Sequence, residues 1–178
     1  MADPPAPFYP GATRRVRPTV RVGVAVVVVI ADEGDDDQQE KKLYCGFRKG
    51  SHGASKLALP GGHLEMNESW EECAVREIRE EMGLSLLSSS DTNIEFLHVT
   101  NDIMKDDEKH YVTIFMVAKA PSGAIPENLE PEKCEGWDAY TLAQLTDMLG
   151  TETLFLPLEH MLSERPQKLL DMLQVHDE

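Results

Sequence analysis

The sequence predicts a mixed α/β domain arranged around one prominent helix. Short runs rich in β-branched residues recur along the chain, and the valine-rich run 20–31 is the longest of them. Residues 68–82 contain no glycine or proline and consist of good helix formers. With 178 residues, 41% of them apolar and 28% charged, the chain has the size and composition of one folded domain.

The first segments differ sharply in composition. Residues 1–18 are rich in proline and predict a flexible arm ahead of a folded domain at 19–178. The run 20–31 is too β-branched and too short for a comfortable helix, so we expect a buried strand. The acidic segment 32–42 then predicts a solvated hairpin tip, which leads to a short strand at 43–47.

The middle of the chain holds the best-defined helix. A short strand is expected at 57–60, before the helix at 68–82. Asn67 or Ser69 could cap the helix at its start. Gly83 ends it, because glycine readily adopts the left-handed conformation found at helix ends.

The last third predicts three more strands and two helices. The segment 101–109 is polar and reads as a turn between two strands, whereas Pro166 interrupts the final helical segment. The expected strands span 94–100, 110–118 and 134–140, and the expected helices span 142–149 and 158–175.

Charge and composition exclude several classes of function. The 17 Lys and Arg against 32 Asp and Glu give a net charge of −15, which opposes binding to a nucleic-acid polymer. The longest apolar run, 22–31, is too short to span a membrane. Three cysteines without a paired spacing suit a reducing compartment, and no secretory signal is visible. We therefore expect a cytoplasmic protein, with nuclear entry left open.

Two carboxylates occupy the wrong face of the central helix. On a helical wheel centred on Trp70, Cys73 and Ile78 belong to the apolar face that should turn inward. Glu77 and Glu81, one turn apart, fall in the middle of that face. Like charges at this spacing repel, and partly buried carboxylates need protonation, a cationic partner or a metal ion.

Two interpretations of these carboxylates remain at this point. Magnesium prefers oxygen ligands and needs only one or two carboxylates beside water and substrate phosphates. Alternatively, Arg76 and Arg79 form salt bridges on an acidic, solvated helix. The second interpretation suits the outer face but not Glu77 and Glu81, and Glu80 lies on their flank.

The glycine pair before the helix bears on the same choice. Gly61 and Gly62 stand where the chain is expected to leave a strand and enter a short loop. Glycines there let a metal or a phosphate approach the backbone closely. A glycine pair is also a common turn signal.

The segment GGHLEMNESWEECAVREIREEMGL resembles the Nudix box in every specified position. Gly62, Glu68, Arg76-Glu77, Glu80-Glu81 and Gly83 stand at the spacing of that motif. The resemblance implies a Nudix hydrolase fold, in which a mixed β-sheet lies between helices and a loop-helix-loop box forms the catalytic side.

The same resemblance implies a divalent metal site. In the family the box glutamates hold Mg²⁺ or Mn²⁺, which polarises a diphosphate and helps to activate water. Glu77 and Glu81 are then metal ligands, and Glu80 is a further ligand or the general base. Arg76 orients these catalytic glutamates, and Glu68 fixes the loop to the helix.

Most of residues 20–160 is similar to a narrower branch of the family. The stretches RKGSHGASKLALPGGHLE, HYVTIFM and EPEKCEGW resemble animal and plant nucleoside triphosphate diphosphatases that act on oxidised or modified purine nucleotides. That branch releases a nucleoside monophosphate and pyrophosphate, and commonly forms homodimers. By this resemblance Arg48 and Lys49 lie near the phosphates, with surface cations as the alternative, and Thr113 faces the base pocket, with a simple strand residue as the alternative. His63 stands at the entrance of the box and could contact the substrate, because a neutral imidazole offers both a donor and an acceptor; loop packing is the alternative.

One position departs from that branch. Relatives usually carry tryptophan where this chain has Leu156, beside the base pocket, so a large flat contact is lost. The expected reaction is Mg²⁺-dependent hydrolysis of dGTP and of oxidised or modified purine triphosphates. A dinucleotide, a pterin triphosphate or an isoprenoid diphosphate is the alternative substrate, and a non-catalytic nucleotide-binding module is the alternative to an enzyme.

Overall fold

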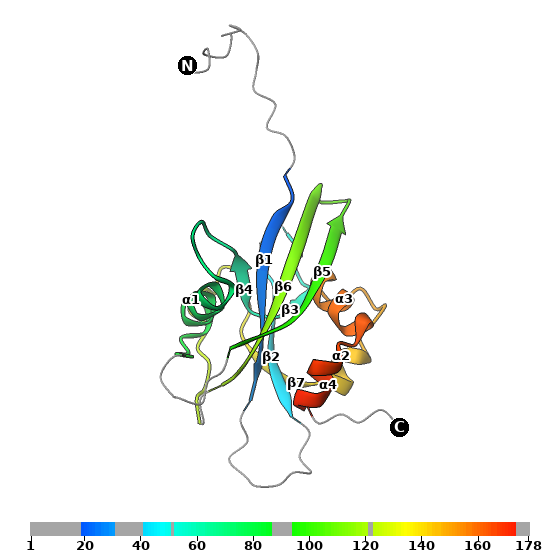
Figure 1. The fold of residues 1–178 in the computed structure, drawn as a ribbon. Helices are drawn as coiled ribbons and strands as arrows, with labels where there is room; N and C mark the ends of the chain where they lie inside the picture. Colours follow the sequence, from blue (N-terminus) through cyan, green and yellow to red (C-terminus); the bar gives the residue numbers. More distant parts are fainter. Residues whose placement is uncertain (1–18, 31–40, 51, 87–93, 121–122, 174–178) are drawn as a thin grey trace, which may run out of the picture.

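A computed structural model of the chain places one mixed β-sheet between two helical layers (Figure 1). It describes residues 19–30, 41–50, 52–86, 94–120 and 123–173. The arm predicted at 1–18 and most of the segment predicted at 32–42 lie outside the described residues. The strands are β1 (Arg21–Val29), β2 (Lys42–Phe47), β3 (Leu57–Ala58), β4 (Gly61–His63), β5 (Glu95–Met104), β6 (Lys109–Lys119) and β7 (Asp138–Thr141); the helices are α1 (Trp70–Met82), α2 (Leu142–Thr146), α3 (Leu156–Glu164) and α4 (Gln167–Leu173).

β1 organises the sheet. The strands run in the order β3-β2-β1-β6-β5, with β1 and β6 parallel and the other described pairs antiparallel. β4 pairs with β1 at Gly23–Ala25, while β2 pairs with β1 at Val29. The continuous valine run Val26–Val29 is buried, because helices cover both faces of the sheet.

Each face of the sheet has its own hydrophobic core. On one face Ile78 and Met82 of α1 pack in a cluster with Val26 and Met116 of the sheet. On the other face the helices α2, α3 and α4 contribute leucines and methionines to a cluster that contains Phe115. The predicted fold class, a mixed sheet between helices, is therefore confirmed.

Capping interactions fix both ends of α1. Ser69 is the N-cap: its hydroxyl accepts from the backbone N–H of Glu72, and the Glu72 carboxylate accepts from the N–H of Ser69. Gly83 ends the helix with φ of 67°, in the left-handed region. The helix thus begins one residue after Ser69, two residues later than its predicted start at Glu68. Trp70, the centre of the wheel, is 42% exposed and packs against Phe96 at the outer end of the helix.

The turn predicted at 101–109 is wrong for most of its length. β5 continues to Met104 and β6 begins at Lys109, so only four residues form the turn. The polar residue Asp102 lies inside β5 because it is fully buried and hydrogen-bonded, a situation that composition alone does not reveal.

Several other boundaries also differ. The glycine pair belongs to β4 rather than to a loop, because Gly61 and Gly62 pair with β1. The strand expected at 134–140 is confined to Asp138–Thr141, and Cys134 contributes only an isolated bridge to Arg48.

The C-terminal helices have other bounds than predicted, and residues 174–175 lie outside the described residues. α2 stops at Thr146, and the segment predicted at 158–175 divides into α3 and α4 at Pro166, where the break was expected. None of the helices in the described ranges is long and apolar enough to cross a membrane.

Candidate active site

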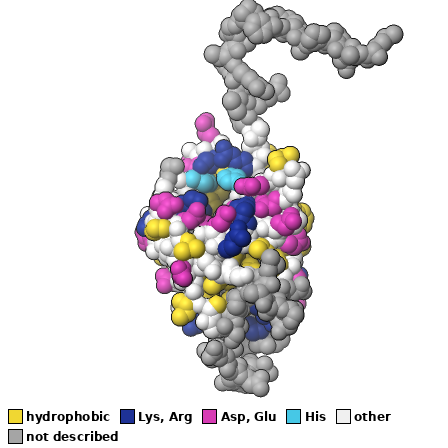
Figure 2. Space-filling model, turned by 90° about the vertical axis from the view of Figure 1, so that its left-hand side faces the viewer, with side chains coloured by type: hydrophobic (Ala, Val, Ile, Leu, Met, Phe, Trp, Pro, Cys, Tyr) yellow, Lys and Arg dark blue, Asp and Glu magenta, His cyan; other side chains and the backbone are white. Residues whose placement is uncertain are grey.

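A cavity of about 530 Å³ joins α1 to the start of α3. Strands β1, β2, β4 and β6 supply much of the remaining lining. Figure 2 shows charged side chains and histidines bordering an apolar hollow on the face of the molecule that carries α1. We call one side the acidic wall, formed by Arg76, Glu77, Glu80 and Glu81, and the other the aromatic wall, formed by His52, Tyr111, Thr113, Phe115 and Phe155.

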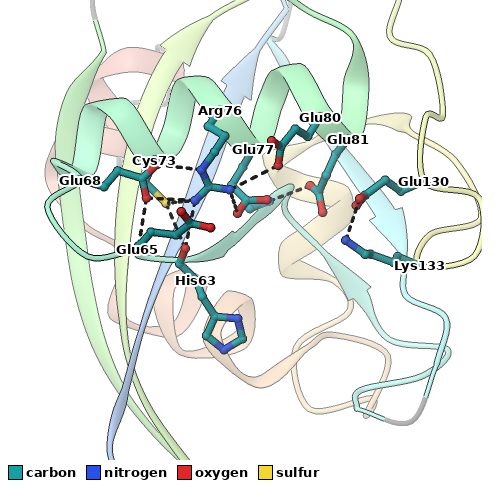
Figure 3. Close-up of polar contacts among 11 residues, drawn as sticks. His63, Glu65, Glu68, Cys73, Arg76, Glu77, Glu80, Glu81, Glu130 and Lys133 are labelled. Carbon is teal, nitrogen blue, oxygen red and sulfur yellow. Dashed lines mark hydrogen bonds and ion pairs between the residues drawn. The ribbon is translucent and has the colours of Figure 1, made fainter.

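Arg76 organises the acidic wall (Figure 3). Its Nε donates to Glu68 at 2.7 Å, and its Nη1 donates to Glu77 at 2.6 Å and to Glu80 at 3.3 Å. A further contact, from Nη2 to the backbone oxygen of His63 at 3.1 Å, ties the helix to β4. The guanidinium therefore holds three carboxylates at once, and hydrogen bonds to charged groups are the strong ones.

Glu77 and Glu81 are buried far more than Glu80. The Glu77 side chain is 12% exposed, against 46% for Glu80. Burial raises the pKa of Glu77, although Arg76 opposes that change. Burial also raises the pKa of Glu81 to about 7, even though its carboxylate accepts a hydrogen bond from the N–H of Gly61 at 2.9 Å. These acids thus lie on the inward side of α1.

The glycine pair Gly61-Gly62 allows the acidic wall to pack closely against β4. Gly61 has φ of 144°, and a Cβ there would stand 2.1 Å from the backbone oxygen of Val24. A Cβ on Gly62 would stand 2.2 Å from Oε1 of Glu77. Only glycine leaves room for the Glu77 carboxylate beside β4.

Besides Arg76, three cationic residues line the same cavity: Arg48, Lys49 and Lys133. Arg48 lies over the ring of Phe155, with 4.5 Å between its guanidinium carbon and the ring centroid. Lys133 pairs with Glu130 at 2.7 Å, and the charges of that carboxylate and of the α1 acids raise the pKa of Lys133. The acidic wall therefore faces cations that can meet a phosphate chain.

Of the other residues predicted to bind substrate, some line the cavity and one does not. His63 and Thr113 line the cavity, and Nε2 of His63 lies 3.0 Å from the hydroxyl of Tyr111. Leu156 is the first residue of α3 and is not among the lining residues. Its neighbours Phe155 and Pro157 line the cavity instead, because the chain turns into α3 at this point.

Sequence reasoning missed several members of the aromatic wall, among them His52 and Phe155. The ring of His52 meets that of Phe155 edge-on at 5.3 Å, and its Nδ1 lies 2.7 Å from a carboxylate oxygen of Asp107. Burial lowers the pKa of His52. Its segment reads as a flexible connection, and no local pattern signals that a turn 55 residues later will hold it. Phe155, the neighbour of Leu156, places an aromatic ring in the cavity lining.

The chemistry of the acidic wall fits a divalent cation. Glu77, Glu80 and Glu81 offer the oxygen ligands that Mg²⁺ prefers, and all three line the cavity. Within the described residues, however, no three His, Cys, Asp or Glu side chains converge closely enough to hold an ion. Arg76 engages Glu77 and Glu80, and β4 engages Glu81, so these carboxylates would turn from those partners to bind a metal.

Comparison with protein families assigns the chain. A family model described as the NUDIX domain matches residues 21–158. The chain belongs to the Nudix family. The matched region contains the whole acidic wall and the aromatic wall up to Phe155.

Individual relatives match over shorter stretches. An ADP-ribose pyrophosphatase of Methanocaldococcus jannaschii is 31% identical over 98 residues, which cover 55% of this chain and 55% of that protein. An 8-oxo-dGTP diphosphatase of Escherichia coli is 49% identical over 35 residues, which cover 20% of this chain and 27% of that protein. The chain thus spans about half the length of one curated relative and about a quarter of the other.

Solved structures agree on the fold. The MutT Nudix hydrolase of Burkholderia pseudomallei superposes with a TM-score of 0.57 at 27% identity, over 71% of this chain and 86% of that one. The Nudix domain of Shewanella oneidensis NrtR, solved with ADP-ribose, gives a TM-score of 0.64 at 18% identity, over 91% of this Nudix chain and 94% of that one.

Proposed function

We propose that this Nudix protein is a Mg²⁺-dependent nucleoside triphosphate diphosphatase. Its substrates are purine deoxynucleotides such as dGTP and their oxidised or modified forms, and its products are the nucleoside monophosphate and pyrophosphate. The relevant branch is that of the animal and plant enzymes to which the sequence outside the box is similar.

One observation carries this proposal: a single cavity holds an acidic wall and an aromatic wall. Such a site suits a ligand with a charged chain at one end and a flat ring at the other, and a nucleoside triphosphate has both. The cavity volume of about 530 Å³ lies within the range of ordinary small-molecule sites.

The residues of the acidic wall would bind the cation, accept a proton and orient one another. Glu77, Glu80 and Glu81 would hold the cation, which when bound supplies Lewis-acid chemistry at the diphosphate. Glu80, the most exposed of the three, accepts the proton of the attacking water. Arg76 orients the carboxylates, while Arg48 and Lys133 neutralise phosphate oxygens.

The aromatic wall takes the base. Phe155 and Tyr111 line the cavity, and aromatic rings bury a large contact area. His52 and His63 lie beside Tyr111 and extend this surface.

The test is turnover with product identification. The purified protein is incubated with Mg²⁺ and, separately, dGTP, 8-oxo-dGTP, dATP, ADP-ribose and geranyl diphosphate, and each product is identified by mass. Monophosphate with pyrophosphate from a purine triphosphate is the expected result. Orthophosphate release, or turnover of another compound alone, contradicts the assigned reaction.

Matched variants locate the chemistry. Glu77→Gln and Glu81→Gln are expected to lower kcat at least about a hundredfold while the fold is retained, because each removes a charged oxygen ligand. Glu71→Gln, an equal change at an exposed position of the same helix, keeps wild-type turnover. Unchanged turnover in both inner variants contradicts the role given to the acidic wall.

A further inference from the structure

Three buried polar side chains lie together beside the aromatic wall. Thr100, Asp102 and Thr113 are 3%, 0% and 5% exposed, and they are the buried polar or charged residues among those that the structure describes. They come from the neighbouring strands β5 and β6, in which Thr100 stands opposite Thr113. A polar cluster concentrated at one place in an otherwise apolar interior indicates a specific task.

Asp102 is the acceptor at the centre of this cluster. Its Oδ2 accepts hydrogen bonds from the hydroxyls of Thr100 at 2.8 Å and Thr113 at 2.5 Å. Its Oδ1 lies 2.8 Å from Nδ1 of His160, a half-buried residue of α3. Whichever of Asp102 and His160 carries the proton between them, Oδ2 remains the acceptor for both threonines.

Stability alone does not call for a carboxylate here. Replacing a buried ionic group with well-packed apolar residues is often neutral or stabilising, because the charge must be taken out of water. The surrounding sheet already supplies an apolar core that includes Phe115. A role in the neighbouring cavity is therefore the better account of Asp102.

The hydrogen bond to Asp102 fixes the direction in which the hydroxyl of Thr113 can bond to anything else. Thr113 lines the cavity, whereas Asp102 does not. A threonine hydroxyl has one proton, and that of Thr113 is given to Asp102. The lone pairs that remain on Thr113 can only accept a hydrogen bond, so a ligand group that reaches this hydroxyl must donate to it.

We propose that Asp102 is a positioning residue that makes the aromatic wall select a base with a protonated ring nitrogen as hydrogen-bond donor. The chemical class is a lactam ring such as guanine, whose N1–H donates, in preference to a ring such as adenine, whose N1 is unprotonated. Thr113 contacts the base, and Asp102 acts through Thr113. The inference rests on the proposed function, because it places a nucleobase in this cavity.

The experiment measures binding of dGMP and dAMP by calorimetry, so that no turnover is needed. In the wild-type protein dGMP is expected to bind at least about tenfold more tightly than dAMP, because a lone pair that faces a lone pair leaves both unpaired. Thr113→Val removes the acceptor and should bring the ratio close to one. Asp102→Ala frees the hydroxyl to donate or accept, and should lower the ratio to about threefold or less.

Two further variants separate orientation from packing. Thr100→Ala removes a hydroxyl bound to the same Oδ2, but it leaves the bond between Thr113 and Asp102, so the preference for dGMP should remain. Asp102→Asn keeps a carbonyl oxygen for Thr113 and should restore the preference that Asp102→Ala loses. Thermal unfolding of every variant identifies any that do not fold.

The outcomes divide cleanly. A wild-type ratio near one, a ratio unchanged in folded Asp102→Ala or Thr113→Val, or an equal loss in Thr100→Ala, overturns the proposal. Hydrolysis of dGTP together with any of these results leaves the proposed function standing. If the variants shift the binding ratio as expected but no triphosphate is hydrolysed, the role of Asp102 stands and the proposed function is contradicted. If the protein neither binds these nucleotides nor hydrolyses a triphosphate, both the role of Asp102 and the proposed function are contradicted.

Discussion

The two walls of the cavity are built in opposite ways. The four residues of the acidic wall lie within six positions of one capped helix, and Arg76 links two of the three acids. The aromatic wall draws its members from segments as distant as His52, Tyr111 and Phe155. The proposed chemistry is thus concentrated in one local motif, whereas the proposed contacts with the substrate base depend on how distant segments meet.

The largest effect is expected where the acidic wall buries charge. Burial raises the pKa of Glu81 from 4.5 to about 7, so its favourable contribution to folding is present below pH 4.5 and is lost as the pH rises through 7. In EDTA, the stability of Glu81→Gln relative to wild type should therefore rise by about 3 kcal/mol between pH 4 and pH 8. Urea unfolding at several pH values measures this difference; a difference independent of pH would contradict it.

The next effect concerns the backbone that lies against the acidic wall. Gly62→Ala places a Cβ against the Glu77 carboxylate and should lower kcat/KM about a hundredfold, because small displacements of catalytic groups are costly. Gly23→Ala is the matched change on β1, where the nearest atoms would be 3.7 Å from the Cβ, and it should leave the free energy of unfolding almost unchanged. Wild-type kcat/KM in Gly62→Ala would show that the carboxylate position is not critical.

A smaller effect of opposite sign is expected at Glu68. The hydrogen bond from Arg76 lowers the pKa of Glu68 to about 2, so its contribution to stability is present above pH 4.5 and is lost as the pH falls through 2. Glu68→Gln should cost about 1 kcal/mol at pH 7, since solvent screens the pair, and almost nothing near pH 2. Glu71→Gln, measured alongside it, should show no such dependence on pH.

The smallest effect is expected on the aromatic wall. Phe155→Leu keeps an apolar side chain but removes the ring that lies beneath Arg48. KM for a purine triphosphate should rise about fivefold or less with little change in kcat, because binding is lost equally from substrate and transition state. Steady-state kinetics measure both constants, and a fall in kcat alone would assign Phe155 to the chemical step.

The acidic wall could be predicted from the sequence better than the aromatic wall. The 3.6-residue period, Ser69 and Gly83 are local signals, so α1 and the inward side of Glu77 could be predicted. The polar stretch around Asp102 was misread as a turn, because its hydrogen-bond partners lie on β6 and α3.

The aromatic wall shows the same limit. His52 and Phe155 carry no local mark of a shared site, since 103 positions separate them along the chain. Their role depends on tertiary contacts, which spacing and propensity do not encode.

Trp137 is a natural fluorophore that lies against the acidic wall. Its indole N–H donates to the backbone oxygen of Glu81 at 3.3 Å, and its ring lines the cavity. Trp70, the other tryptophan of the chain, is exposed at the opposite end of α1 from Glu81. The intrinsic fluorescence of the unlabelled protein therefore comes from Trp137 in the site and from Trp70 outside it. A quencher dissolved in the buffer can reduce the emission of Trp70, while the emission of Trp137 reports whether the site is occupied.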